Sequence, residues 1–190
     1  MKHLFPALRL LLIMTILTGV FYPLAITGIA QAFFSHQANG NMFRVGGKIK
    51  GSELVGQKFA SARYFWSRPS AIDYNPMPSG ATNLGPTSVA LQEAVRQRRA
   101  HIVSADALPS DARIPVDMLF ASASGVDPHI SPETARLQID RIAKARGFTT
   151  EQKSKLAVLV EHFIESPQWG IFGDPRVNVF RLNVALDQLN

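Results

Sequence analysis

The segment Leu10–Phe34 constrains the fold most, because its twenty-five residues include no charged side chain. As a helix rising about 1.5 Å per residue it would be roughly 38 Å long, which exceeds the roughly 30 Å hydrocarbon core of a bilayer. The sequence therefore predicts a transmembrane helix over residues 10–34, preceded by a short tail over residues 1–9 and followed by a polar domain over residues 35–190.

The apolar segment has a second interpretation as a cleaved signal peptide. Ala30-Gln31-Ala32 matches the small-x-small pattern of a cleavage site, but signal-peptide apolar regions run only about 7–15 residues, so a retained anchor is favoured. Positive charge is nearly balanced between the two sides of the span and does not fix the orientation. We expect the simpler arrangement for a signal-anchor, with a cytoplasmic tail, a single pass of the cytoplasmic (inner) membrane and an extracytoplasmic domain.

Small and weakly polar residues within the span predict contact with another helix. Thr15 and Gly19 are four residues apart and share a helix face, and Thr18 adds a further small side chain. Pro23 lacks a backbone donor and should kink the helix. The alternative is an ordinary lipid-facing anchor.

Composition excludes several classes of site. The chain carries a net charge of +6 and no cysteine, so disulfides, thiolate metal sites and thiol catalysis are excluded. The densest basic cluster, Arg96, Arg98 and Arg99, would spread over different faces of a helix and has no interleaved aromatic residues. We therefore expect no nucleic-acid partner.

The domain interleaves helical and strand patterns, which predicts an α/β (α+β-like) fold with a small sheet packed by helices. Helices are expected from Thr87 or Ser88 to about His101, from Ser131 to Gly147, from Thr149 with a capping box at Gln152, and over Val184–Leu189 behind an Asn183 cap. Strands are expected over Phe43–Val45, Lys48–Ile49, Val116–Phe120 and Arg176–Leu182.

Two irregular segments stand out as candidate binding surfaces. Tyr64-Phe65-Trp66 places three aromatic side chains side by side, and at least one should meet a partner or the membrane unless the segment plugs the core. Asp73–Pro86 is rich in proline, glycine and asparagine, so it predicts a long functional or Ω-type loop.

The sequence offers no self-sufficient catalytic site. Ser124, Asp127 and His129 are the residue types of a hydrolase triad, but the G-x-S-x-G pattern is missing, and turn and capping roles are favoured. His129 has no partner at a metal-ligand spacing, and Gly46-Gly47-Lys48 lacks most of a phosphate loop. A membrane-anchored envelope hydrolase using these three residues, and an independent anchored binding module, remain as rival hypotheses.

An ordered set of motifs closely resembles the C subunit of the Kdp potassium-transporting ATPase, the KdpC family. The motifs are Tyr22-Pro23, Gln37 to Gly40, Gly51-Ser52, Gly56-Gln57, Arg68-Pro69-Ser70, Tyr74-Asn75-Pro76, Asn83 to Pro86, Ser122 to Pro132, Gln138, Arg141 to Arg146, Val177-Asn178, Leu182-Asn183 and Ala185 to Asp187. Ala81-Thr82 stands where the family usually has Gly-Ser.

The resemblance implies a non-catalytic accessory subunit that joins a potassium-binding channel-like subunit and a P-type ATPase subunit. It also implies a role as a catalytic chaperone that raises the ATPase subunit's affinity for ATP, although the chain itself should hold no tightly bound cofactor. Gln138 and Gln152 are the nucleotide-contact candidates. The predicted partner-binding residues are Thr15, Thr18, Gly19, Pro23, Tyr64, Phe65, Trp66, Arg68, Asn75 and Asn83.

Overall fold

The computed structural model describes residues 3–45 and 47–189. The chain divides into two compact units, Met1–Phe43 and Arg44–Asn190. The first two residues of the predicted tail, and Gly46 of the phosphate-loop pattern, lie outside the described residues.

The first unit is a helical rod composed of α1 (Leu4–Ile16), the π-helix η1 (Leu17–Phe21), α2 (Tyr22–Phe33) and the short α3 (Ser35–Ala38). The most apolar 18-residue window of the thirty-residue helical run has a mean hydropathy of 2.1, and none of that window is buried within the protein. By length and composition it can cross a membrane. The helix begins at Leu4, so it extends six residues beyond the N-terminal end of the apolar segment and includes Arg9.

Pro23 changes the hydrogen-bond pattern of this helix. The N–H of Tyr22 bonds to the carbonyl of Leu17, five residues back, and η1 ends immediately before Tyr22. Proline cannot donate to the carbonyl four residues earlier, and a π-helical turn is a common way for a helix to absorb such a disruption. The structure therefore has a π-helical turn on the N-terminal side of Pro23, the residue at which the sequence predicts a kink.

Among the described residues from 42 onward, the regular elements are two small sheets and six helices. The elements are β1 (Met42–Val45), β2 (Lys48–Ser52), α4 (Val89–Ala105), α5 (Val116–Leu119), β3 (His129–Ile130), α6 (Pro132–Leu137), α7 (Ile139–Arg146), α8 (Thr150–His162), β4 (Ile164–Glu165), β5 (Arg176–Asn178) and α9 (Val179–Leu186). β1 pairs with β2, and β5 lies between β3 and β4 in an antiparallel sheet. His129 faces Asn178 and Ile164 faces Val177 in its register. The predicted class, an apolar helix followed by a domain with a small sheet and helices, is confirmed.

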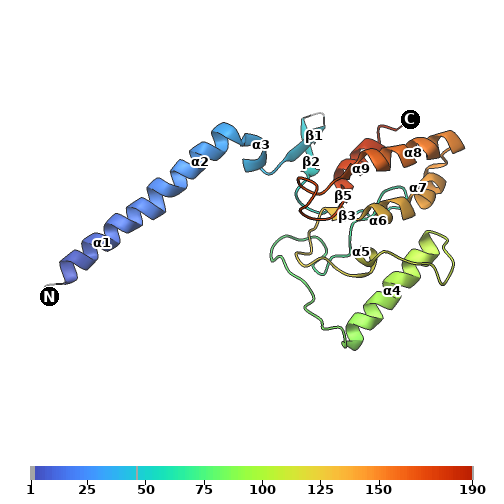
Figure 1. Ribbon diagram of the computed structural model, residues 1–190, viewed down its shortest axis with the longest axis horizontal. Helices are drawn as coiled ribbons and strands as arrows, with labels where there is room; N and C mark the ends of the chain where they lie inside the picture. The colour runs from blue at the N-terminus through green and yellow to red at the C-terminus, as the bar shows by residue number, and fades with distance from the viewer. Residues whose placement is uncertain (1–2, 46, 190) are drawn as a thin grey trace. The chain divides into compact units, whose positions relative to one another are not determined.

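The core lies where the three-stranded sheet meets α6, α7, α8 and α9. Figure 1 shows α8 and α9 above the sheet, with α4 and α5 below it. The buried apolar side chains that pack together are Phe65, Ile130, Ala135, Ile139, Ile142, Leu156, Val160, Val177, Val179, Leu182 and Leu186.

The capping signals predict the helix ends well. Ser88, Ser131 and Thr149 each accept a hydrogen bond from the N–H three residues later, as N-caps do. The capping box of Thr149 and Gln152 forms in full. α7 ends at Gly147, whose φ of 68° is left-handed and suits glycine.

Three predictions of secondary structure are wrong. Val116–Leu119 is the helix α5 rather than a strand, because a short apolar run does not distinguish the two. The strand that begins at Arg176 ends at Asn178, whose side chain caps α9 by accepting from the N–H of Arg181. Asn183 therefore lies inside α9, and the terminal helix begins five residues earlier than expected.

The helix predicted from Ser131 to Gly147 is two helices, interrupted at Gln138. The Gln138 side chain is fully buried and bonds to the chain around Trp66, which is described below.

Residues 53–88 contain no helix or strand, and they pack closely against the turn before β3. The N–H of Gly56 bonds to the carbonyl of Val126, and a Cβ on Gly56 would lie 2.5 Å from the Asp127 carbonyl oxygen. A Cβ on Gly125 would lie 2.5 Å from the Ile72 side chain, and its φ is 72°. Only glycine allows these approaches, so both positions fix the path of the irregular chain.

Candidate functional site

Arg141 of α7 fixes the backbone that carries the aromatic cluster. Its Nη1 donates to the carbonyl of Ala62 at 2.7 Å and to that of Tyr64 at 3.1 Å. Its guanidinium also lies 3.8 Å from the centre of the Trp66 ring. A planar guanidinium suits both tasks, because it donates in a fixed fork and stacks on aromatic faces.

Two buried amides complete the attachment of this segment. The Asn183 side chain accepts from the N–H of Phe65 at 2.8 Å and donates to its carbonyl at 3.0 Å. Gln138 accepts from the N–H of Trp66 at 2.7 Å and donates to its carbonyl at 3.3 Å. Each amide thus satisfies both backbone groups of one residue, as a neighbouring strand would.

Arg141 also pairs with Asp106 at the end of α4. Its Nε lies 3.0 Å from Asp106 Oδ1, and both side chains are almost completely buried. Burial raises the pKa of Asp106 above its ordinary value despite the neighbouring Arg141 charge. Burial likewise lowers the pKa of Arg141, against the opposing effect of Asp106.

The three aromatic side chains separate. Phe65 is fully buried in the core, so its side chain has no surface to present in this conformation. The Tyr64 hydroxyl donates to Asp187, and Arg146 lies over the ring and pairs with Asp187 at 2.7 Å. Trp66 stacks on His101 of α4, with the ring centres 5.1 Å apart. Of the three aromatic side chains, Tyr64 and Trp66 are half-buried, and only these two are partly exposed.

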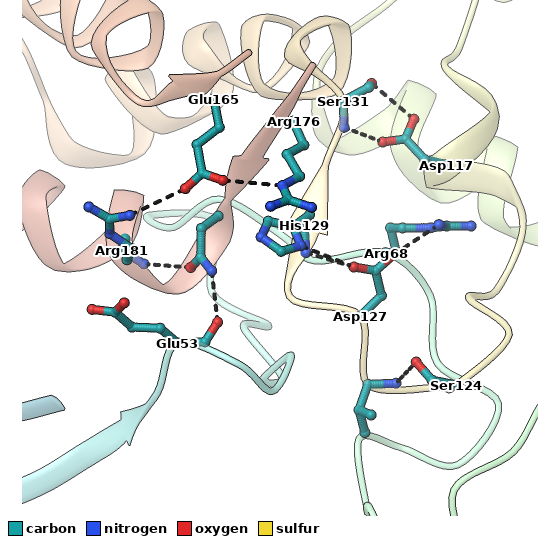
Figure 2. Close-up of polar contacts among 12 residues, drawn as sticks. Glu53, Arg68, Asp117, Ser124, Asp127, His129, Ser131, Glu165, Arg176 and Arg181 are labelled. Atoms are coloured by element: carbon teal, nitrogen blue, oxygen red, sulfur yellow. Dashed lines mark hydrogen bonds and ion pairs between the residues drawn. The ribbon is translucent and has the colours of Figure 1, made fainter. Parts of the chain in front are cut away.

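Arg68, Asp127 and His129 form a polar cluster that lines a cleft of about 560 Å³. Arg68 Nη1 lies 3.0 Å from Asp127 Oδ2, and the other oxygen of Asp127 accepts from the N–H of His129, whose Nδ1 lies 3.6 Å away (Figure 2). Burial acts to raise the pKa of Asp127, but the hydrogen bonds from His129 and the charge of Arg68 outweigh it, so the pKa lies below its ordinary value.

The Ser124 hydroxyl takes no part in this cluster. Its oxygen accepts from the N–H of Val126, and Figure 2 shows it apart from His129. Among the described residues no hydrogen bond joins Ser124 to His129. Asp127 is thus near His129 but bonds to its backbone N–H, and the Ser124 nucleophile is not next to its base, so the three residues do not form a triad.

The exposed edge of β3 is covered by Asp117 of α5. Its carboxylate accepts from the N–H of Ser131 at 2.7 Å and from the Ser131 hydroxyl (Figure 2). It also accepts from the hydroxyl of Thr134. Asp127 accepts the N–H of His129 in the same way. These two carboxylates occupy the outward donors beside β3, so the edge cannot pair with another strand there.

The loop after Arg68 is held at its start and exposed at its tip. The Tyr74 hydroxyl donates to the Arg68 carbonyl at 2.6 Å, and burial together with Asp73 raises the pKa of Tyr74 to about 12. The Asn75 side chain accepts from the N–H of Met77, and Asn83 has a φ of 52°. Both asparagines are exposed and available to a partner.

In the first unit, Thr15, Thr18, Gly19 and Pro23 are all exposed along the apolar helix. The Thr18 hydroxyl donates to the Met14 carbonyl, so its proton is already hydrogen-bonded within the helix. Nothing lies within 4 Å of a Cβ built on Gly19. A neighbouring helix could therefore approach this part of the rod closely.

The two glutamine candidates for nucleotide contact have structural partners. Gln138 is fully buried between Trp66 and Thr134, and Gln152 accepts from the N–H of Thr149 in the capping box. A nucleotide contact at either would require these bonds to break. Within residues 3–45 and 47–189, no cluster of histidine and carboxylate side chains could hold a metal ion.

Sequence reasoning missed the roles of Arg141 and Asn183, and it missed Asp106 and Asp117 entirely. A signal existed for Gln138, because a polar residue three positions after Ala135 and four before Ile142 lies on the apolar stripe of the helix. Asp106 and Asp117 lie in an apparent loop and an apparent strand, and no pattern marked them.

Comparisons with known proteins agree on one family. The family described as "KdpC: K+-transporting ATPase, c chain" matches residues 4–188. The chain is 45% identical to the potassium-transporting ATPase KdpC subunit of Methylococcus capsulatus, over 99% of this chain and 98% of that one. It is 47% identical to the subunit of Sorangium cellulosum and 46% identical to that of Geobacter sulfurreducens, covering at least 98% of each chain. The family predicted from the motifs is confirmed.

Proposed function

The chain belongs to the KdpC family, the c chains of K+-transporting ATPases, and from this membership we propose its role. It acts as a non-catalytic, single-pass accessory subunit that stabilises the assembly of a potassium-binding, channel-like subunit with a P-type ATPase subunit. The observation that carries the proposal is the family match over nearly the whole chain, from the apolar helix to the last helix. Residues characteristic of ion selectivity or phosphoryl transfer belong to the partners.

The apolar helix is proposed as an assembly surface as well as an anchor. Thr15, Thr18 and Gly19 are small or weakly polar residues that a neighbouring helix can approach closely. Close approach matters because apolar lipid provides no hydrophobic driving force for helix association, which then depends on van der Waals packing. The helix lies in the cytoplasmic (inner) membrane with its amino terminus inside, and the domain is extracytoplasmic.

The domain is proposed to cover the outer mouth of the channel-like subunit. The residues that support this are the half-buried Tyr64 and Trp66, Arg68 at the cleft, and the exposed Asn75 and Asn83. Arg141, Gln138 and Asn183 would hold the backbone of residues 62–66 in place while a partner binds.

An influence on ATP affinity, as a catalytic chaperone, would have to be allosteric. A domain outside the membrane cannot touch cytoplasmic ATP, so differential contacts with two states of the ATPase subunit would be required. Gln138 and Gln152 remain the first residues to substitute in a nucleotide-binding assay.

Replacing Thr15 and Gly19 by leucine tests the assembly role. The larger side chains would block close helix approach, so the other subunits should be lost during purification in detergent, as measured by co-purification with the tagged chain. Ala25→Leu, a similar enlargement later in the helix, is the matched control and should retain the subunits.

Unchanged co-purification of the double variant would contradict the proposed helix surface. Normal growth at limiting potassium after deletion of the chain would contradict the transport role itself. Loss of an esterase activity in Ser124→Ala, with assembly intact, would support the rival hydrolase instead.

A further inference from the structure

The loop between β4 and β5 exposes an apolar tip, and one of its residues, Phe172, also lines the cleft of Arg68, Asp127 and His129. Residues 166–173 carry no charge, and within them Trp169, Ile171 and Phe172 are 88%, 78% and 61% exposed. Fully exposed tryptophan is uncommon in a folded domain, and a cluster of such side chains marks a contact site.

The tip has a defined shape. Gln168 and Phe172 exchange backbone hydrogen bonds of 2.9 and 3.0 Å, and the N–H groups of Gly170 and Ile171 bond to carbonyls within the loop. The Trp169 ring packs edge-on against Phe172, with the centres 6.0 Å apart. Four backbone donors are thus satisfied inside the loop, which lowers the cost of placing this backbone in a medium poor in water.

Trp169 also adopts a backbone conformation that a large side chain rarely takes. Its φ is 53°, and Gly170 follows with 75°. Such turns ordinarily use glycine, asparagine or aspartate. An unfavourable backbone at an exposed residue points to a function for the side chain that it displays.

The surroundings of the tip favour a lipid surface over a protein partner. A specific protein interface needs roughly 800 Å² from each side, so these three side chains by themselves do not form one. The base of the loop is charged: Glu165 pairs with both Arg176 and Arg181, and Asp174 follows the apolar run (Figure 2). An apolar tip with a tryptophan above a zwitterionic base suits the boundary between acyl chains and headgroups.

Because the apolar helix holds the domain near the bilayer, even a weak insertion of the loop tip can persist. Only ten residues, 34–43, separate the apolar helix from the second unit, a reach of about 35 Å when fully extended. A domain held this close to a bilayer has a high effective concentration at its surface, so a contact too weak to bind alone can persist.

We propose that Trp169, Ile171 and Phe172 insert into the headgroup region of the bilayer in which the chain is anchored, as a second membrane contact. The proposal rests on the proposed membrane attachment of the chain.

The chain's two tryptophans make a direct test possible. The full chain is reconstituted into vesicles of phosphatidylcholine and phosphatidylglycerol, with and without brominated acyl chains, and tryptophan emission is compared. Brominated lipid should quench part of the emission of the unmodified chain. In Trp169→Phe, where only the half-buried Trp66 remains, the lipid-quenched emission should be lost. Ile171→Ser keeps both tryptophans and should reduce the quenching and shift the emission to longer wavelength.

Equal quenching in the unmodified chain and in Trp169→Phe would overturn the proposal. A second result would also overturn it. In that result, brominated lipid does not quench Trp169 in the chain alone, and Trp169 becomes shielded from aqueous iodide only when the other subunits are added. The tip would then bind protein rather than lipid. Both variants change exposed side chains, and an unchanged midpoint of thermal unfolding verifies that they fold.

Discussion

The two tryptophans of this chain lie in irregular segments that are stabilised in opposite ways. Trp66 is sandwiched between Arg141 and His101, and its backbone is bonded to Gln138 from another element seventy-two residues away. Trp169 lies at the tip of a loop whose hydrogen bonds all join residues within five positions of one another. One segment takes its shape from the rest of the domain, and the other from itself.

The difference shows that an aromatic residue in a loop can serve either to hold the fold or to contact a partner or membrane. The segment around Trp66 cannot keep its path without the side chains of α7 and α9, so its aromatic residues are structural first and present only their edges. The loop of Trp169 contributes little to the core, so its apolar side chains are free to serve a contact. Substitutions in the two segments should therefore have very different effects.

Arg141→Ala should have the largest effect. It removes the bonds to the carbonyls of Ala62 and Tyr64 and leaves Asp106 buried without its partner, so unfolding free energy should fall by about 3–5 kcal/mol. The measurement is chemical denaturation of the full chain in detergent. Trp169→Ser is the matched variant in the other segment and should leave the midpoint unchanged. Equal losses in the two variants would show that both segments depend on the domain in the same way.

Asn183→Ala should have an intermediate effect. It leaves both backbone groups of Phe65 buried and unpaired, which should cost about 1–3 kcal/mol in the same measurement. Gln188→Ala removes an exposed amide five residues later and serves as control. If Asn183→Ala were as stable as the control, the amide would not be what holds the Phe65 backbone.

The buried Asp106 and the half-buried Asp127 should give small pH effects of opposite sign. The folded pKa of Asp127 is lowered, so its contribution is present above the ordinary carboxyl pKa and is lost as pH falls through the folded value. The folded pKa of Asp106 is raised, so its contribution is present below the ordinary value and is lost as pH rises through the folded value. Thermal unfolding midpoints across the acid range, compared with Asp127→Asn and Asp106→Asn, should show the two slopes changing in opposite directions. The same direction of change in both variants would contradict these assignments.

Local signals in the sequence predicted the elements whose causes are local. Uncharged length identified the apolar helix, and Ser88, Ser131, Thr149 and Gly147 marked helix ends because capping involves neighbours within a few residues. The motifs identified the family. The strand expected over Val116–Phe120 and the cap expected at Asn183 were wrong because short apolar runs and single asparagines fit more than one local structure.

The sequence by itself thus determined that the chain has one apolar helix and a mixed domain, and to which family it belongs. Only the tertiary structure decided that Arg141, Gln138 and Asn183 converge on the backbone of residues 62–66, that Phe65 is buried, and that Trp66 and Trp169 have different surroundings. The physical reason is distance along the chain. A cap is set by residues three or four positions apart, whereas these contacts join residues separated by more than seventy positions and exist only once the helices have packed.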